Sequence, residues 1–120
     1  MDGAKVGIFE DHKGWCEVLT EILEENGHTV VAIACSMNEA RTAIDGLGEG
    51  SLDVAVVDGN LNPNTDTGDD GAEITRLLKE RLGGIVIIGF SGGNDVEGVD
   101  HSVSKNGVPD EEIPAIIAQI

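Results

Sequence analysis

The sequence is poor in aromatic residues and in cations, and each shortage excludes a class of protein. One Trp, two Phe and no Tyr occur among 120 residues, so the core must be built from aliphatic side chains. Only seven Lys and Arg oppose 23 Asp and Glu, which gives a formal net charge of −16 at pH 7. So few cations cannot neutralise a run of phosphates, so we expect no nucleic-acid partner and repulsion from an anionic membrane surface.

Cysteines and long apolar stretches are scarce as well. Cys16 and Cys35 are too few for a disulfide scaffold, and we interpret them as reduced thiols. No apolar run approaches the length of a membrane span, and the opening MDGA does not have the features of a signal peptide. We therefore expect a cytoplasmic protein. The length fits a single domain over 1–120, and 40% hydrophobic residues are enough to fold it.

What the sequence does contain is a regular alternation of short apolar runs and helical patterns. The runs are nearly continuous, as in strands buried on both faces of a parallel sheet, and lie at 6–9, 30–34, 54–57 and 85–88. A fifth strand at 100–104 is poorer in β-branched bulk. Strands that alternate with helices predict βαβ units, so we expect an α/β, doubly wound, five-stranded parallel sheet with helices on both faces.

Between the strands, apolar residues recur at the spacing of an α-helix. Two of these segments open with a capping box, in which a small polar residue and a Glu three positions later satisfy the first backbone N–H groups. The two pairs are Ser36 with Glu39 and Asp70 with Glu73. The helical patterns cover residues 15–23, 40–47, 74–82 and 113–120.

The last helical segment contains a proline, which limits where that helix can begin. Pro114 has no N–H to donate and is tolerated only in the first turn of a helix. We therefore expect Asp110 to start this helix and the helix to begin no earlier than about Glu111.

Polar residues that follow the apolar runs define the expected site, because ligands of doubly wound sheets bind beyond the carboxyl ends of the strands. These residues are Glu10 and Asp11, Asp58, Ser91 and Lys105. Three crowded carboxylates would take up protons unless a cation neutralised them, and all-oxygen ligands favour Mg²⁺. A carboxylate beside Mg²⁺ can attack a phosphoryl donor, while an ammonium and a hydroxyl stabilise the transferred group.

The sequence resembles the receiver domain (CheY-like) of two-component response regulators over essentially its whole length. The matching pieces are FEDH at 9–12, VVD at 56–58, DG at 70–71, IGFSG at 88–92 and VSK at 103–105. Each piece alone is weakly specific, but five in this order, each beside a strand end, are strong. The resemblance implies a flavodoxin-like fold with the strand order 2-1-3-4-5.

The resemblance also implies a role for each site residue. Asp58 would be the phosphoacceptor, and Ser91 and Lys105 would contact the phosphoryl group. Mg²⁺ would be held by Glu10, Asp11, Asp58 and the backbone carbonyl of Asn60. A histidine kinase or histidine phosphotransfer protein would supply the phosphoryl group. The chain would thus be a signalling domain of a two-component system or phosphorelay and not an enzyme, although it would promote its own phosphorylation and dephosphorylation.

Three features depart from the pattern of that family. Asp70 lies twelve residues after Asp58, which indicates an insertion at 62–68. Only six residues, 92–97, separate Ser91 from Gly98, so we expect the usual fourth helix to be missing or reduced to a turn. Ser102 stands where the family has an aromatic switch residue, three positions before Lys105.

The missing helix would leave part of the sheet bare. Strand alternation predicts that Ser102 and its alternate neighbours, Asp100 and Ser104, lie on the bare face, with Val99 on the opposite one. Ile85 and Ile87 should share the bare side, covered by the long loop or by a second copy of the chain in a homodimer.

Other interpretations compete with the receiver. The segment after Asp58 places oxygen-bearing residues at the alternate positions of an EF-hand calcium loop, but Pro63 stands at the required glycine and Asp69 at the final Glu. A degenerate receiver acting as a phosphorylation-independent interaction module is the main alternative function. The missing helix and Ser102 favour it, whereas the intact acidic residues oppose it. A hydrolase with an aspartyl intermediate lacks a second general acid.

Overall fold

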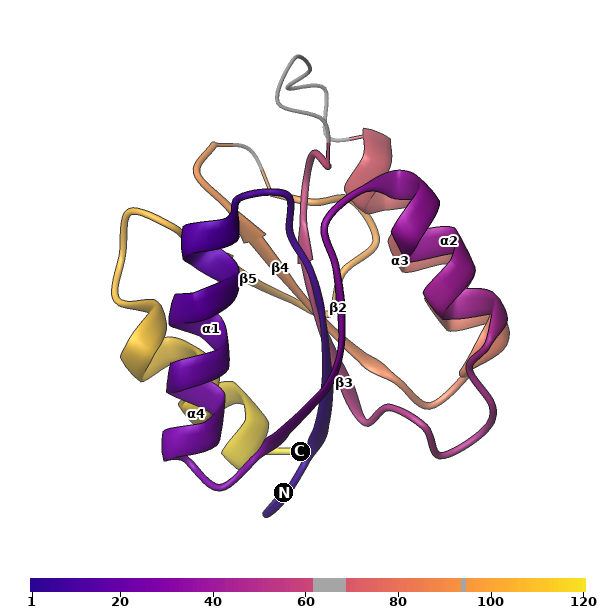
Figure 1. The fold of residues 1–120 in the computed structure, drawn as a ribbon. Coiled ribbons are helices and arrows are strands. Elements are labelled where there is room, and N and C mark those ends of the chain that lie inside the picture. The colour runs from indigo at the N-terminus through magenta and orange to yellow at the C-terminus, as the bar shows by residue number, and fades with distance from the viewer. Residues whose placement is uncertain (62–68, 94) are drawn as a thin grey trace.

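A parallel sheet of five strands forms the centre of the molecule, in the order β2-β1-β3-β4-β5 (Figure 1). The structure is a computed structural model that describes residues 1–61, 69–93 and 95–120. The predicted insertion at 62–68, with the middle of the calcium-loop pattern, lies outside the described residues. The strands are β1 (Lys5–Phe9), β2 (Thr29–Ala34), β3 (Val54–Asp58), β4 (Val86–Ser91) and β5 (His101–Ser104). The predicted fold class and strand order are confirmed.

Helices cover both faces of this sheet (Figure 1). Over the described ranges they are α1 (Lys13–Glu25), α2 (Met37–Asp45), α3 (Asp69–Arg81) and α4 (Pro109–Ala118). The first and last pack on one face, and α2 and α3 pack on the other. The described residues between β4 and β5, which are 92, 93 and 95–100, contain no helix. None of the helices described is long and apolar enough to cross a membrane.

The sheet separates two aliphatic cores, because neighbouring strand residues point to opposite faces. Ile8 belongs to the core under α1 and α4, whereas the next residue, Phe9, belongs to the core under α2 and α3. All five residues of β3 are buried, as predicted for a central strand.

The edge strand β2 differs from that prediction. Val31 and Ile33 are 47% and 45% exposed, so burial on both faces was wrong for this strand. The register with β1 shifts at this point, since Val6 pairs with Val30 and Gly7 pairs with Ala32. Val31 is therefore the extra residue of a β-bulge, which bends and twists the edge of the sheet.

The face of β4 without a fourth helix is nevertheless covered. Ile85 and Ile87 are buried against α3. Val96 and Val99, from the connection between β4 and β5, pack over Gly89, where an added Cβ would approach Val99 Cγ2 at 3.1 Å and Val96 Cβ at 3.2 Å. Among the described residues, α3 and this connection supply the cover, and burying these side chains requires no second chain.

The fifth strand begins at His101, one residue later than predicted. Alternation therefore does not extend to Val99, which lies on the α3 face and not on the opposite one. Asp100 instead binds the edge of β4: its Oδ2 accepts from Ile87 N–H at 2.8 Å, and its own N–H donates to Ile87 O at 2.9 Å. Lys79 Nζ also contacts Asp100 at 3.0 Å.

The last helix also begins earlier than predicted. Pro109 is its first residue and Val108 its N-cap, because a proline at this position leaves no backbone donor unsatisfied. Pro114 consequently lies inside the helix. The carbonyl that loses a partner belongs to Asp110, an exposed residue that water can reach, so the predicted start at about Glu111 was too strict.

Candidate functional site

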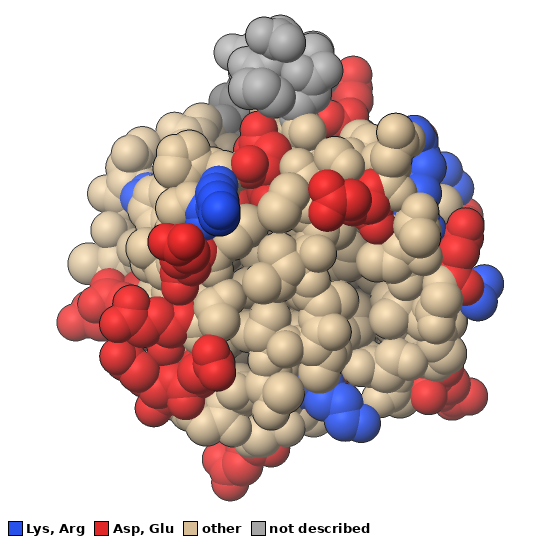
Figure 2. Space-filling model, viewed as in Figure 1, with Lys and Arg blue, Asp and Glu red and all other residues tan. Residues whose placement is uncertain are grey.

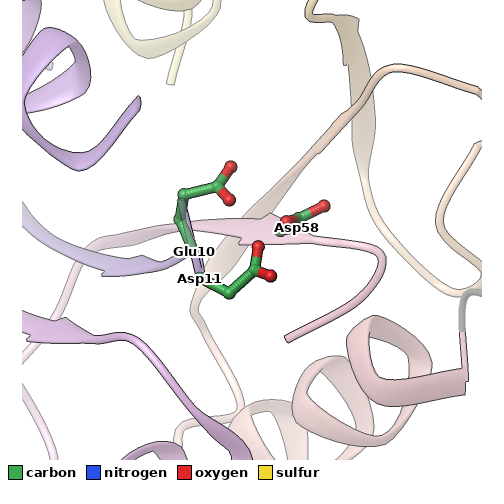
Figure 3. Close-up of side chains that lie close together, drawn as sticks. All are labelled: Glu10, Asp11 and Asp58. Atoms are coloured by element: carbon green, nitrogen blue, oxygen red, sulfur yellow. The ribbon is translucent and has the colours of Figure 1, made fainter. Parts of the chain in front are cut away.

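Three carboxylates meet at the carboxyl edge of the sheet (Figure 3). Glu10 and Asp11 follow β1 and Asp58 ends β3, and each offers an oxygen within 4.8 Å of the other two. The juxtaposition follows from the sheet, because β1 and β3 pair in parallel with Phe9 opposite Val57. Residues just beyond the ends of two such strands are neighbours in space.

Lys105 reaches this cluster from the end of β5. Its Nζ lies 2.7 Å from Glu10 Oε1 and 3.3 Å from Asp58 Oδ2. The ammonium passes over two of the few aromatic rings, 5.4 Å from the centroid of Phe90 and 5.9 Å from that of Trp15. The rings meet edge to face with centroids 5.0 Å apart, so they form a stable support that directs the ammonium toward the carboxylates.

Burial makes two carboxylates of this cluster, Glu10 and Asp11, more difficult to ionise. Glu10 is 1% exposed, and burial, assisted by Asp58, raises its pKa to about 8, although Lys105 lowers it. The pKa of Asp11 is also raised, first by burial and then by Asp58. One ammonium therefore does not neutralise the site, and a further cation would stabilise the charged carboxylates.

The donor set fits a hard divalent cation. It consists of carboxylate oxygens only, which suits Mg²⁺ better than Zn²⁺. Oε1 of Glu10 is buried, and its close contact is the ion pair with Lys105 Nζ at 2.7 Å. One ammonium thus serves a buried carboxylate that stands beside two others, which leaves room in the charge balance for a cation.

The turn between β1 and α1 fixes the first two carboxylates. Glu10 N–H donates to Ala34 O at 3.0 Å, and its Oε2 accepts from His12 N–H at 3.0 Å. His12 is the N-cap of α1, with its Nδ1 accepting from Trp15 N–H at 3.3 Å. The cap therefore holds the carboxylates and the aromatic support in one turn of chain.

The turn after Asp58 is held by the start of α3. Leu61 N–H donates to Asp70 Oδ2 at 3.1 Å, and Gly71 N–H donates to Gly59 O at 2.8 Å. An added Cβ on Gly71 would approach Asp58 O at 2.5 Å, so only glycine allows α3 to lie this close to the strand. The predicted capping role of Asp70 was thus wrong: α3 begins at Asp69, and the Asp70 carboxylate binds the turn instead.

Ser91 and Asn60 lie beside the cluster. Ser91 ends β4, and its backbone carbonyl accepts from Lys105 N–H at 2.9 Å. Within the described ranges its hydroxyl accepts from Gly93 N–H at 3.1 Å and does not bond the carboxylates. Asn60 stands in the turn after Asp58, where its N–H donates to Asp58 Oδ1 at 3.4 Å. The structure thus brings Lys105 into contact with Glu10 and Asp58 and leaves Ser91 and Asn60 at the margin of the cluster.

Ser102, at the place of the usual aromatic switch residue, is exposed on β5. Among the described residues, no contact joins Ser102 to the acidic cluster. Its short polar side chain cannot act as an aromatic side chain does when it moves between buried and exposed positions.

Comparison with known proteins gives the fold and not the family. No family model matches the sequence, and no curated protein matches it. Solved structures do match. A two-component response regulator of the LuxR family from Aurantimonas sp. SI85-9A1 has a TM-score of 0.76 and 24% identity, over 98% of this chain and 85% of that one. A CheY-like receiver domain protein from Methanospirillum hungatei JF-1 has a TM-score of 0.76 and 20% identity, over 98% and 94%.

A third similar structure carries a phosphoryl group on an aspartic acid. It is a response regulator protein from Burkholderia pseudomallei with a phosphorylated aspartic acid, a calcium ion and citrate. Its TM-score is 0.69 with 16% identity, over 97% of this chain and 74% of that one. The chain described here therefore has the fold of response-regulator receiver domains.

Proposed function

We propose that the chain is a phosphoacceptor receiver domain in which Asp58 accepts a phosphoryl group from a histidine kinase or a histidine phosphotransfer protein. One observation carries the proposal: Lys105 Nζ lies 3.3 Å from Asp58 Oδ2 within a cluster of three carboxylates. A purely structural ion pair needs one carboxylate for one ammonium, whereas the two further carboxylates of this cluster cost stability unless a cation and an anionic group join them.

Glu10, Asp11 and Asp58 would hold Mg²⁺, together with the backbone carbonyl of Asn60. When bound, the ion neutralises the negative charge that accumulates as phosphoryl oxygens approach the carboxylates. The formal net charge of −16 adds to the negative potential at this site and favours the binding of a cation.

The chain's own residues would act on the transferred group as follows. A carboxylate oxygen of Asp58 forms the new bond to phosphorus while the bond from phosphorus to the donor's imidazole nitrogen breaks. The electron pair of that bond stays on the imidazole, which takes up a proton. Lys105 stabilises a phosphoryl oxygen by moving from Asp58 to it, and the Ser91 hydroxyl donates to another by leaving its turn with Gly93.

The experiment is intact mass spectrometry after incubation with acetyl phosphate and Mg²⁺. We expect the wild-type protein to gain one phosphoryl group, and Asp58→Asn to gain none because it keeps the shape of the side chain but has no nucleophilic carboxylate. Asp110→Asn, which removes an exposed carboxylate from α4, is the matched control and should be modified like the wild type. Equal modification of Asp58→Asn would move the acceptor elsewhere.

The second candidate is an interaction module that binds its partner without phosphorylation. The exposed Ser102 and the absence of a helix in the described residues between β4 and β5 favour it, because the usual readout is missing. It requires that neither acetyl phosphate nor a kinase modifies the folded protein. Homodimerisation through the face beside β5 stays a prediction, which sedimentation at increasing protein concentration tests.

A further inference from the structure

A groove runs between α1 and the edge strand β2, apart from the acidic site. It has a volume of about 590 Å³. One wall is formed by α1, and Ile33 of β2 and Cys35 line the other side. We call this surface the α1–β2 groove.

The β2 side of the groove exposes more apolar surface than is expected of an edge strand that faces water. Ile33, which lines the groove, is 45% exposed and has a β-branched aliphatic side chain. Exposure of such a side chain to water is unfavourable, and covering it with a partner is favourable.

The α1 side of the groove is strongly acidic. Glu17, Glu21, Glu24 and Glu25 line it against one cation, Lys13. Acidic side chains gather over α1 beside an uncharged surface over β2, as the left half of Figure 2 shows. None of the four glutamates forms an ion pair with the described part of the chain, and pairs such as Glu17 with Glu21 repel one another at a spacing of four residues.

The shape of the edge indicates how a partner would dock. An extended peptide that adds a strand needs a regular edge, and the bulge at Val31 interrupts that edge. A helix laid into the groove needs no backbone hydrogen bonds, only an apolar stripe for Ile33 and a charged flank for α1. A second copy of this chain would bring two glutamate rows together, which the net charge of −16 opposes.

We propose that the α1–β2 groove docks a basic amphipathic helix of a partner protein. Lysines or arginines on one flank of that helix pair with the glutamates of α1, and its apolar face covers Ile33. Docking here does not depend on phosphoryl transfer at Asp58, so Asp58→Asn keeps it.

The probe is a labelled synthetic helix of about 18 residues, long enough to fold, with Leu on one face and Lys on the others. A control peptide has the same composition in an order that spreads Leu around the helix. Fluorescence anisotropy with the full chain should show the amphipathic peptide binding at least about tenfold more tightly than the reordered one, a difference of about 1.4 kcal/mol.

Variants separate the groove from general charge attraction. The triple variant Glu17→Gln, Glu21→Gln, Glu24→Gln should weaken binding about tenfold at low salt and reduce its salt dependence. The matched triple Glu49→Gln, Asp95→Asn, Glu111→Gln removes the same charge from exposed positions outside the groove and should weaken binding less than about twofold. Ile33→Thr should weaken binding at every salt concentration.

Alkylation of Cys35 locates the peptide independently. Cys35 is half-buried in the groove, whereas Cys16 is buried, so iodoacetamide should modify Cys35 first and the bound peptide should slow that reaction. Equal binding of the two peptides, equal loss in both charge triples, or unprotected Cys35 would each overturn the proposal. A dimer that Ile33→Thr dissociates, with no peptide binding, would instead assign the groove to a second copy.

Discussion

The two faces of the sheet are closed by different means near β4. On one face, α1 and α4 cover large side chains such as Phe90. On the other, α3 covers Ile87, and the connection between β4 and β5 lays Val96 over Gly89. A helix stands about 10 Å from a sheet and leaves room for large residues, whereas an extended segment lies closer and needs glycine beneath it. The difference shows that a missing helix changes the residues below it as well as the surface.

The acidic site depends mainly on the first face. Lys105 reaches the carboxylates over Phe90 and Trp15, which belong to the core under α1 and α4. From the second face, Asp70 and Gly71 of α3 hold the turn that follows Asp58. The two supports can therefore be broken separately.

The largest loss of stability is expected for a substitution at Gly71, where α3 lies against the turn that follows Asp58. Gly71→Ala places a Cβ 2.5 Å from the backbone oxygen of Asp58 and 2.9 Å from Val96 Cγ1, and neither α3 nor β3 can move freely. We expect a loss of about 3 kcal/mol in the free energy of unfolding, measured by urea denaturation.

Gly83→Ala is the matched control, because an added Cβ there meets nothing within 4 Å. It should change stability by less than about 0.5 kcal/mol. Equal losses in the two variants would show that α3 is not closely packed on β3.

The next effect tests the extended cover itself. Val96 is 4% exposed, so Val96→Ala removes buried methyl groups over Gly89 and should cost about 2 kcal/mol in the same denaturation. Val108→Ala, at a valine that is 48% exposed, should cost much less. A negligible cost at Val96 would mean that the connection does not cover the sheet in solution.

A smaller effect of opposite sign is expected at the acidic site. Asp58→Asn removes one of three carboxylates that share one ammonium, so it should raise stability by about 1 kcal/mol in magnesium-free buffer. Thermal unfolding with and without Mg²⁺ measures this, and Mg²⁺ should stabilise the wild type more than the variant. Asp110→Asn should give no gain. A loss of stability in Asp58→Asn would contradict a crowded site.

The smallest change in stability is expected at Asp100, which attaches the connection between β4 and β5 to the edge of β4. Burial alone would raise the pKa of Asp100, but the hydrogen bond from Ile87 N–H and the ammonium of Lys79 lower it below the usual 3.8. A depressed carboxylate pKa adds stability above pH 3.8 that is lost as pH falls through the lower folded value. Asp100→Asn should therefore be less stable at neutral pH and lose less stability on acidification, measured by denaturation at several pH values.

The sequence predicted best what depends on strand ends. Asp58 follows an apolar run and Lys105 follows the weaker fifth strand, and the parallel pairing of β3, β4 and β5 brings both residues to one edge of the sheet. The turn bound by Asp70 was harder to predict, because the same residue type three positions before a Glu also suits a helix cap.

Little in the sequence indicated that the connection between β4 and β5 covers one face of the sheet. No helical or strand periodicity assigned Val96 to a face, and extending the alternation of the fifth strand to Val99 assigned that residue to the wrong one. The bulge at Val31 could not be predicted either, because one extra apolar residue does not change the apolar character of the run. Gly71 and Gly89 mark two of the close approaches in the structure, but a glycine in a sequence does not distinguish a close approach from a turn.

The position of Trp15 gives the protein a built-in optical reporter. With no Tyr and a single Trp, nearly all of the intrinsic fluorescence comes from one indole, whose ring centroid lies 5.0 Å from that of Phe90 and 5.9 Å from Lys105 Nζ. A cation or anion that displaces that ammonium changes the electric field across the indole. The spectrum of the unlabelled chain therefore follows the occupancy of the acidic cluster, with no background from other chromophores of comparable strength.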